Sequence, residues 1–202
     1  MRAIFYPALL ALLFACVEAA TVNLGTAENY AILAGSSVII SGGAVSGGTV
    51  GVSPGTAITH GGTVIIKDSA NAAAAQTDTK AAYDEAEGLS GAIDLTGIDL
   101  GGLTLTQGVY KFSSSASGNG VLTLNAGGNA DAVWVFQIAS TLVFASGSSV
   151  VMSGGGNPHR VYWQVGSSAT ITGATVVGNF MAYASITMSG STVEGRVLAR
   201  AL

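Results

Sequence analysis

The chain has 202 residues, of which 49% are hydrophobic, 7% are aromatic and only 9% are charged, and its net charge is −4. This length suits one domain with a substantial core, and the negative charge argues against binding to nucleic acid or to an anionic membrane surface. Charged residues make up about a quarter of an ordinary soluble protein. The surface of this chain must therefore be covered by Ser, Thr, Gly, Asn and Ala.

The first twenty residues have the pattern of a secretory signal peptide. Arg2 precedes the short apolar run AIFYPALLALLFACV, and the small residues of VEAA predict cleavage after Ala19 or Ala20. The alternative, an uncleaved membrane anchor, would need a longer apolar run. Cys16 is the one cysteine in the sequence, so we expect residues 21–202 to form a single secreted, extracellular domain without disulfides.

Between the signal peptide and residue 68 the chain is predicted to form short strands separated by glycines. The segments YAILA, SVIISG and AVSGGTVG, which begin at Tyr30, Ser37 and Ala44, follow one another within roughly 20 residues. Glycine-rich corners between short alternating segments are typical of strands joined by tight turns. We expect these segments to form one three-sided coil.

Residues 68–89 are predicted to form one long helix. Small residues recur at helical spacing and define a docking stripe. The stripe consists of Ala72, Ala75, Thr79, Ala82, Ala86 and Leu89, with Tyr83 beside it. We expect Asp68 or Ser69 to cap the start of the helix and Gly88 to mark its end. Because the stripe is made of small side chains, the helix can lie close to the surface that it covers.

After the helix the sequence divides into further coils with a period of roughly 20 residues, which predicts a β-solenoid. We expect a first side formed by LTLTQ, LTLNA, LVFAS, TITG and ITMSG, which begin at Leu103, Leu122, Leu142, Thr170 and Ile186. We expect a last side formed by GVYKF, VWVFQI, VYWQV, NFMAYA and RVLAR, which begin at Gly108, Val133, Val161, Asn179 and Arg196. A third side begins at Ser148, Ala174 and Ser191.

The last side differs from the others because its segments are apolar or aromatic at consecutive positions. Strands buried on both faces have this pattern. The side therefore needs a cover, and the helix at 68–89 is the one candidate. The predicted fold is all-β with one long helix: a right-handed, three-sided β-solenoid with the α-helix packed along the last side, parallel to the solenoid axis.

The outward positions of the solenoid are rich in hydroxyl groups. Stacked strands place outward side chains about 4.8 Å apart between coils and about 6.6 Å apart along a strand. Each Thr offers a hydroxyl for hydrogen bonding and a methyl group that ordered water can surround. The predicted grid consists of Thr104, Thr106, Thr123, Asn125, Thr170, Thr172, Thr187, Ser189 and Ser41, with Thr49, Thr175 and Thr192 just past a glycine corner. Val143 and Ala145 interrupt it.

Several segments in order along the chain resemble the secreted ice-binding proteins that are built on a discontinuous β-solenoid with a flanking helix. They are VNLGTAENYAILAG, GTVGVSPG, AYDEAEG, GGLTLTQGVYKF, DAVWVFQIASTL, VYWQVGSSATI and STVEGRVLA, which begin at residues 22, 48, 82, 101, 131, 161 and 191. The resemblance implies that the coil before the helix packs beside the C-terminal coil, and that one flat face away from the helix binds ice.

Some members of that family carry a Thr-(Ala/Gly)-x-(Thr/Asn) motif on the ice-binding face. Residues 172–175 (TGAT) match it fully, and residues 189–192 (SGST) and 46–49 (SGGT) match it with Ser in the first place. The resemblance implies that the chain binds the surface of an ice crystal and inhibits ice growth and recrystallisation. We expect a monomer with no cofactor and no metal.

Two other classes of function compete with this hypothesis. Some β-solenoids degrade polysaccharides, but that chemistry needs clustered carboxylates or a calcium site, and the acids after the helix are scattered at Asp94, Asp99, Asp131 and Glu194. His159 and Arg160 follow GGGNP and are expected in a turn. We therefore predict no enzymatic activity. An extracellular adhesin or carbohydrate-binding matrix module is the alternative, although it would favour exposed aromatic residues on its working face.

Overall fold

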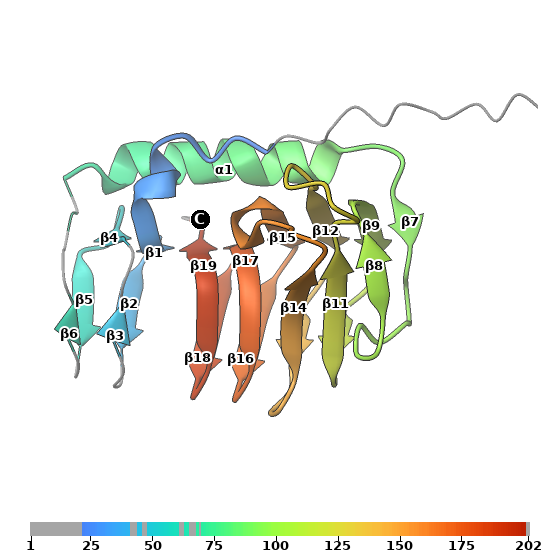
Figure 1. The fold of residues 1–202 in the computed structure, drawn as a ribbon. Helices are drawn as coiled ribbons and strands as arrows, with labels where there is room; N and C mark the ends of the chain where they lie inside the picture. The colour runs from blue at the N-terminus through green and yellow to red at the C-terminus, as the bar shows by residue number, and fades with distance from the viewer. Residues whose placement is uncertain are drawn as a thin grey trace, which may run out of the picture.

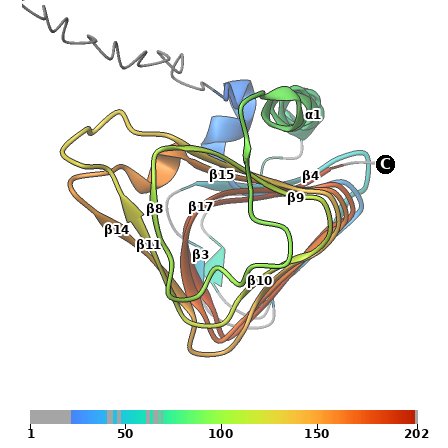
Figure 2. The ribbon, with the colours of Figure 1, turned by 90° about the vertical axis from the view of Figure 1, so that its right-hand side faces the viewer.

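Short parallel strands wind into a three-sided coil, and one helix lies along one of its sides (Figure 1 and Figure 2). The structure is a computed structural model, and it describes residues 22–40, 44–45, 48–60, 63–64, 68 and 70–200. The predicted signal peptide at 1–20 lies outside the described residues. Seen along the axis, the coils stack into a triangle with the helix above one edge (Figure 2).

The three sides of the triangle are named here face a, face b and face c. Face a, beneath the helix, contains β1 (Tyr30–Ala34), β4 (Thr49–Val52), β7 (Ile93–Asp94), β9 (Gly108–Phe112), β12 (Trp134–Ile138), β15 (Val161–Val165) and the C-terminal halves of β17 (Thr175–Ala182) and β19 (Thr192–Ala199). Face b contains β2 (Ser37–Ile40), β5 (Ala57–His60), β10 (Ala116–Gly118), β13 (Leu142–Phe144), β16 (Ser168–Thr172) and β18 (Ser185–Ser189). Face c contains β3 (Ala44–Val45), β6 (Thr63–Val64), β8 (Thr104–Thr106), β11 (Val121–Asn125), β14 (Ser149–Ser153) and the N-terminal halves of β17 and β19.

The strands β17 and β19 turn the corner from face c to face a without ending. The corner falls at Gly178 and Gly195, which are paired in register and have φ values of 113° and 145°. A Cβ atom on Gly195 would lie 2.0 Å from the carbonyl oxygen of Gly178. Glycine is therefore required here both by the backbone conformation and by the close stacking of the two coils.

The coils do not stack in chain order. The first strand, β1, pairs with the last strand, β19, with Ile32 opposite Val197, and on its other side it pairs with β4. The coil before the helix therefore lies beside the C-terminal coil, as the family resemblance implied. In the described residues, this junction is hydrogen-bonded as a ladder on face a.

The core of the solenoid contains a ladder of stacked aromatic rings behind face a. Tyr110, Phe136, Trp163 and Phe180 occupy the same register position on successive strands. The centroids of neighbouring rings are 5.5, 4.0 and 5.5 Å apart, and the three pairs of ring planes are close to parallel, with interplanar angles of 21°, 9° and 7°. Every residue of β12 and β15 is buried, so the prediction of strands covered on both sides is confirmed.

The helix α1 (Ala72–Gly88) covers face a and runs across its strands (Figure 1). The predicted stripe is buried from Ala72 to Ala86, together with Tyr83, and packs on Val135, Tyr162 and Met181. The Nε2 atom of Gln137 donates hydrogen bonds to three carbonyls at the end of the helix, those of Ala86, Glu87 and Leu89. The position predicted for the helix on the last side is confirmed.

The predicted start of the helix was wrong by one turn. The N-cap position is held by Asn71, whose side chain makes no capping hydrogen bond. Asp68 instead accepts hydrogen bonds from the backbone and side-chain nitrogens of Asn71, so it stabilises the turn before the helix. A short 3-10 helix, η1 (Gly25–Asn29), is tied to α1 where Thr26 donates to Asp78 from both its backbone nitrogen and its hydroxyl.

The predicted first side was also wrong, because it joined strands from two different faces. The strand β11 pairs with β8 and β14 on face c, whereas β13 pairs with β10 and β16 on face b. The LTLTQ and LTLNA segments therefore belong with the predicted third side. The reason lies in the strand β10, which is the face b strand between β9 and β11. It is the three-residue segment Ala116–Gly118 (ASG), which is too short and too poor in large residues to be recognised as a strand.

Candidate functional site

Face b presents three ranks of small, uncharged side chains to solvent across β10, β13, β16 and β18. Its middle rank is set by direct register pairs and consists of Ser117, Val143, Thr170 and Thr187. The rank at the start of the strands consists of Ser115, Thr141, Ser168 and Ser185. The rank at their ends consists of Asn119, Ala145, Thr172 and Ser189. None of these twelve side chains carries a charge.

The positions of these side chains are fixed from below and from the side. Beneath the middle rank, the alternate residues of β13 and β16 are fully buried, among them Leu142, Phe144 and Ile171. Hydroxyl groups in the first rank bond to their neighbours, Ser185 to Ser168 at 2.9 Å and Thr141 to Ser115 at 2.8 Å. Because the strands are parallel and in register, the ranks repeat at about 4.8 Å from coil to coil.

The carboxylate of Asp99 lies at the β10 edge of face b and is hydrogen-bonded within the protein. It accepts hydrogen bonds from the backbone nitrogens of Gly101 and Asn119 and from the side chains of Ser117 and Asn119. Burial alone would raise the pKa of this carboxyl group, but the four hydrogen bonds outweigh it and hold the pKa below its ordinary value. The acid therefore orders the edge strand.

Face c is also rich in hydroxyl groups, but it is less regular. The strand β14 is joined to β17 by a single register pair, Ser149 with Thr175, because the longer loop after β14 leads away from the sheet into η2 (Pro158–Arg160). Figure 2 shows the coils of β14 and β11 extending beyond the others at this side. The exposed Glu194 places a charge on β19, within the same face.

The structure divides the predicted grid between the two faces. Thr170, Thr172, Thr187 and Ser189 lie on face b. Thr104, Thr106, Thr123, Asn125, Thr175 and Thr192 lie on face c. Thr49 begins β4, opposite Tyr30 on face a, and Ser41 lies outside the described residues. The twelve predicted residues therefore do not form one surface.

The four-residue motif expected on the binding face spans a corner instead. Thr172 ends β16 on face b and Thr175 begins β17 on face c, with Gly173 between them at a φ of 55°. The second copy behaves in the same way, since Ser189 lies on face b and Thr192 on face c. In the third copy, residues 46–47 lie outside the described residues. The motif thus marks the turn between two faces.

Sequence reasoning missed the first rank of face b. Ser115, Thr141, Ser168 and Ser185 stand at the beginnings of their strands, directly after the corner from face a. The signal that could have found them is a recurring Ser or Thr directly before the first inward residue of each strand, as in STLVF, SSATI and ASITM. These small polar residues resemble turn residues in a single sequence, so their outward alignment becomes visible only in the stacked register.

Within the described residues, no group of three His, Cys, Asp or Glu side chains could hold a metal ion. Arg160 forms an ion pair with Asp131 at 2.8 Å, and Lys80 pairs with Asp84 on the outer side of the helix. In the part of the chain that the structure describes, no helix is long and apolar enough to cross a membrane. Neither ion pair involves a residue of the face b ranks, whereas the carboxylate of Asp99 accepts hydrogen bonds from Ser117 and Asn119 of those ranks.

The fold is therefore that of a helix-flanked parallel β-solenoid, in which the helix covers face a and the outward ranks of face b are uncharged and mostly hydroxyl-bearing. Residues 19–202 match the family described as ice-binding-like, and the chain belongs to that family. It is 46% identical over 193 residues to an ice-binding protein from Nostoc sp. (strain HG1), and the aligned region covers 91% of this chain and 71% of the relative. It is 33% identical over 211 residues to an ice-binding protein from Leucosporidium sp. (strain AY30), which covers 89% of this chain and 79% of that one.

Solved structures show the same fold. An ice-binding protein from an Antarctic biological consortium has a TM-score of 0.81 and 42% identity, over 89% of this chain and 85% of that chain. One from Antarctomyces psychrotrophicus has a TM-score of 0.77 and 33% identity, over 89% and 92%. These relatives are named for binding ice, so the comparisons favour the ice-binding hypothesis and lend no support to the adhesin alternative.

Proposed function

We propose that this protein binds ice through face b and thereby inhibits ice growth and recrystallisation. Family membership supports the binding of ice. The observation that selects the face is the set of three uncharged ranks on β10, β13, β16 and β18, which are joined in one continuous ladder. Face a is covered by the helix, and face c is divided between β14 and β17.

The proposed mechanism follows from the chemistry of the ranks. The hydroxyl groups of Thr170 and Thr187 can hydrogen-bond to water, while their methyl groups and the side chain of Val143 favour a cage of ordered water around them. A charged group at these positions would hold its own hydration shell and disturb that order. Because the side chains are fixed by the buried core behind them, the surface can adsorb to a crystal with little loss of conformational entropy.

We infer that the protein acts by adsorption and not by catalysis, as a secreted monomer. The scattered acids support the first inference, since Asp94 lies on β7, Glu194 lies on β19, and Asp99 and Asp131 lie outside the strands and helices. The carboxylate of Asp99 also accepts hydrogen bonds from within the protein. The signal-peptide pattern at residues 1–20 supports secretion. Size-exclusion chromatography with light scattering on the secreted protein tests both the mature mass and the monomeric state.

Ice-affinity partition tests the function and the face together. The protein is placed in contact with a slowly growing ice hemisphere, and its concentrations in ice and liquid are compared. We expect the wild type to enter the ice, and Thr170→Tyr on face b to reduce that uptake severalfold because the larger ring lifts the crystal away from the neighbouring ranks.

Thr123→Tyr on face c is the matched control. Both threonines are half-buried and lie in the middle of a central strand, so the two changes should alter stability similarly. Exclusion of the wild type from ice would contradict the function. Equal loss of uptake in the two variants would contradict the choice of face.

A further inference from the structure

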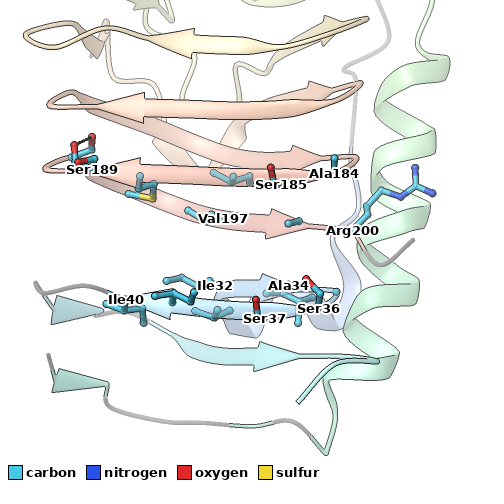
Figure 3. A pocket seen from close by; sticks show the side chains of 18 of the residues that line it. Ile32, Ala34, Ser36, Ser37, Ile40, Ala184, Ser185, Ser189, Val197 and Arg200 are labelled. Carbon is cyan, nitrogen blue, oxygen red and sulfur yellow. Dashed lines mark hydrogen bonds between the residues drawn. The ribbon is translucent and has the colours of Figure 1, made fainter. Parts of the chain in front are cut away.

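The ranks of face b end at two edges that differ in their chemistry. At one edge they end on β18 with Ser185 and Ser189, which also line a groove beside that strand (Figure 3). At the other edge they end on β10 and the corner that follows it, where Asn119 precedes Gly120. Serine hydroxyls are stable in water, whereas an asparagine side chain can lose its amide nitrogen by reaction with the backbone nitrogen that follows it. This reaction is deamidation.

Asn119 and Gly120 form the one Asn-Gly pair in the sequence. The chain has eight asparagines, and the other seven all precede residues that carry a side chain. A Cβ atom on the following residue hinders the approach of the asparagine side chain to the backbone nitrogen, and glycine has no Cβ atom. In the described part of the chain the Gly120 nitrogen donates no hydrogen bond, although the Gly120 carbonyl oxygen accepts one from Ser149. No acceptor therefore holds the reacting nitrogen.

The pair lies at an exposed corner. It follows β10 and precedes β11, where the chain turns from face b to face c. Asn119 is exposed and Gly120 is half-buried, so water can reach the side chain that reacts. Both residues lie outside the strands, and segments of this kind open locally at a lower cost in free energy than paired strands do. The corner can therefore adjust its dihedral angles without the loss of a ladder.

The carboxylate of Asp99 opposes this reaction. Its Oδ2 atom accepts a hydrogen bond from the side-chain nitrogen of Asn119 at 2.5 Å, and its Oδ1 atom accepts one from the backbone nitrogen of Asn119 at 3.0 Å. The side chain of Asn119 must therefore leave Asp99 before its Cγ atom can approach Gly120. Asp99 is charged at neutral pH, because its pKa lies below the ordinary value of an aspartate. This negative charge disfavours the loss of a proton from the nearby Gly120 nitrogen.

We propose that Asn119 is a site of spontaneous deamidation and that Asp99 controls its rate. The Gly120 nitrogen gives up its proton to hydroxide and attacks the Cγ atom of Asn119. The new C–N bond closes a succinimide ring, and the side-chain nitrogen takes up protons from water and leaves as ammonia. Water then adds to either carbonyl carbon of the ring and opens it to aspartate or isoaspartate. The net reaction consumes water and releases ammonia, and nothing is oxidised or reduced.

Either product changes the β10 edge of face b. The new carboxylate lacks the nitrogen that donates to Asp99 and lies beside a group of the same charge, so repulsion replaces a hydrogen bond. Isoaspartate also adds a methylene group to the main chain between β10 and β11. The end rank of face b, which carries no charge in the unmodified protein, gains a negative charge. Loss of ice binding through this charge is a second consequence, and it rests on the proposed function of face b.

Peptide mapping by mass spectrometry tests the reaction on the folded protein. The protein is incubated at mildly alkaline pH and digested beside an unincubated sample, and aspartate and isoaspartate are measured at each asparagine. We expect Asn119 to deamidate about tenfold faster than Asn129, which is also exposed but precedes Ala130. Asp99→Asn should raise the rate at Asn119 severalfold and leave the rate at Asn129 unchanged. Circular dichroism confirms that this variant is folded.

Two results would overturn the proposal. A rate at Asn119 no greater than the rate at Asn129 in the folded wild type would show that the corner is not a preferred site. Equal rates at Asn119 in the wild type and in Asp99→Asn would show that Asp99 does not control the reaction. A rate that rises equally at Asn119 and Asn129 in Asp99→Asn would also contradict the role of Asp99, because it would reflect a general loss of stability.

A matched pair of variants tests the consequence for ice binding. Asn119→Asp introduces one of the two products, whereas Asn129→Asp adds the same charge in the loop between β11 and β12, outside face b. We expect Asn119→Asp to reduce uptake into ice severalfold and Asn129→Asp to leave it unchanged. Equal uptake of the two variants would overturn this consequence alone. Exclusion of the wild type from ice would contradict the proposed function and would leave the deamidation rates unaffected.

Discussion

At the scale of single residues, the few charged groups close to face b are held by hydrogen bonds within the protein. Asp99 illustrates this best, because its two oxygens accept four hydrogen bonds from Gly101, Ser117 and Asn119. These donors belong to the edge strand β10 and the turns beside it. The carboxylate thus fixes the β10 edge of face b, and its oxygens are engaged by donors of the protein.

The pH dependence of stability should reveal this role of Asp99. Its pKa in the folded state is below that of the unfolded chain, which is about 3.9 for Asp. The stabilisation is therefore complete above the unfolded value and is lost as pH falls through the lower folded value. We expect Asp99→Asn to reduce the free energy of unfolding by about 2 kcal/mol at pH 7, since hydrogen bonds to a charged group are lost.

Urea unfolding at pH 7 and at pH 2 measures this difference. The difference in free energy of unfolding between the wild type and Asp99→Asn should narrow at the lower pH, because the wild-type carboxyl group loses its charge as the pH falls through its folded-state pKa. An equal gap at the two pH values would show that the charge of Asp99 has no part in stability.

At the scale of elements, the alternation of inward and outward residues was predictable, but the face of each strand was not. Leu122 and Leu124 point inward as expected, yet they pair with β14 and not with β13. The face of a strand follows from its place in the coil. When one short strand such as β10 is not recognised, the strands next to it in the chain are assigned to the wrong face. The helix was easier to predict because its small-residue stripe extends over four turns and determines one docking face.

The glycine corner of β17 and β19 offers a test at this scale. Gly195→Ala forces a Cβ atom to within 2.0 Å of the Gly178 carbonyl oxygen at a φ of 145°. We expect a loss of about 3 kcal/mol in the free energy of unfolding, because backbone strain adds to the clash. Thermal or urea unfolding measures it.

Gly88→Ala is the control for that substitution. Gly88 is the last residue of α1, and a Cβ atom there would meet no other atom within 4 Å. Alanine should leave stability unchanged or raise it slightly, since it favours the helix. Similar destabilisation by the two substitutions would contradict the requirement for glycine at the corner between face c and face a.

At the scale of the whole molecule, the sequence predicted the solenoid, the covering helix and the hydroxyl-rich surface, and the stacked register separated that surface into two. Thr170 and Thr123 have similar surroundings in the sequence, within TIT and LTL, but lie on different faces. Nothing local distinguishes them. Flatness and the absence of charge belong to a whole face, so the candidate site could be chosen only after the coils were aligned.

The most direct test of the central claim, that face b contacts ice, uses two valines on different faces. Val143 lies in the middle of β13 on face b and is 41% exposed, and Val151 lies in the middle of β14 on face c and is 39% exposed. Each is replaced by Cys in a protein that begins after residue 20 and so lacks Cys16. A maleimide polyethylene glycol chain is then attached. The freezing-point gap, which is the difference between the melting and freezing temperatures of an ice crystal in the protein solution, is measured before and after attachment. We predict that attachment at Val143→Cys abolishes the gap and that attachment at Val151→Cys preserves it, whereas the opposite result would contradict the account.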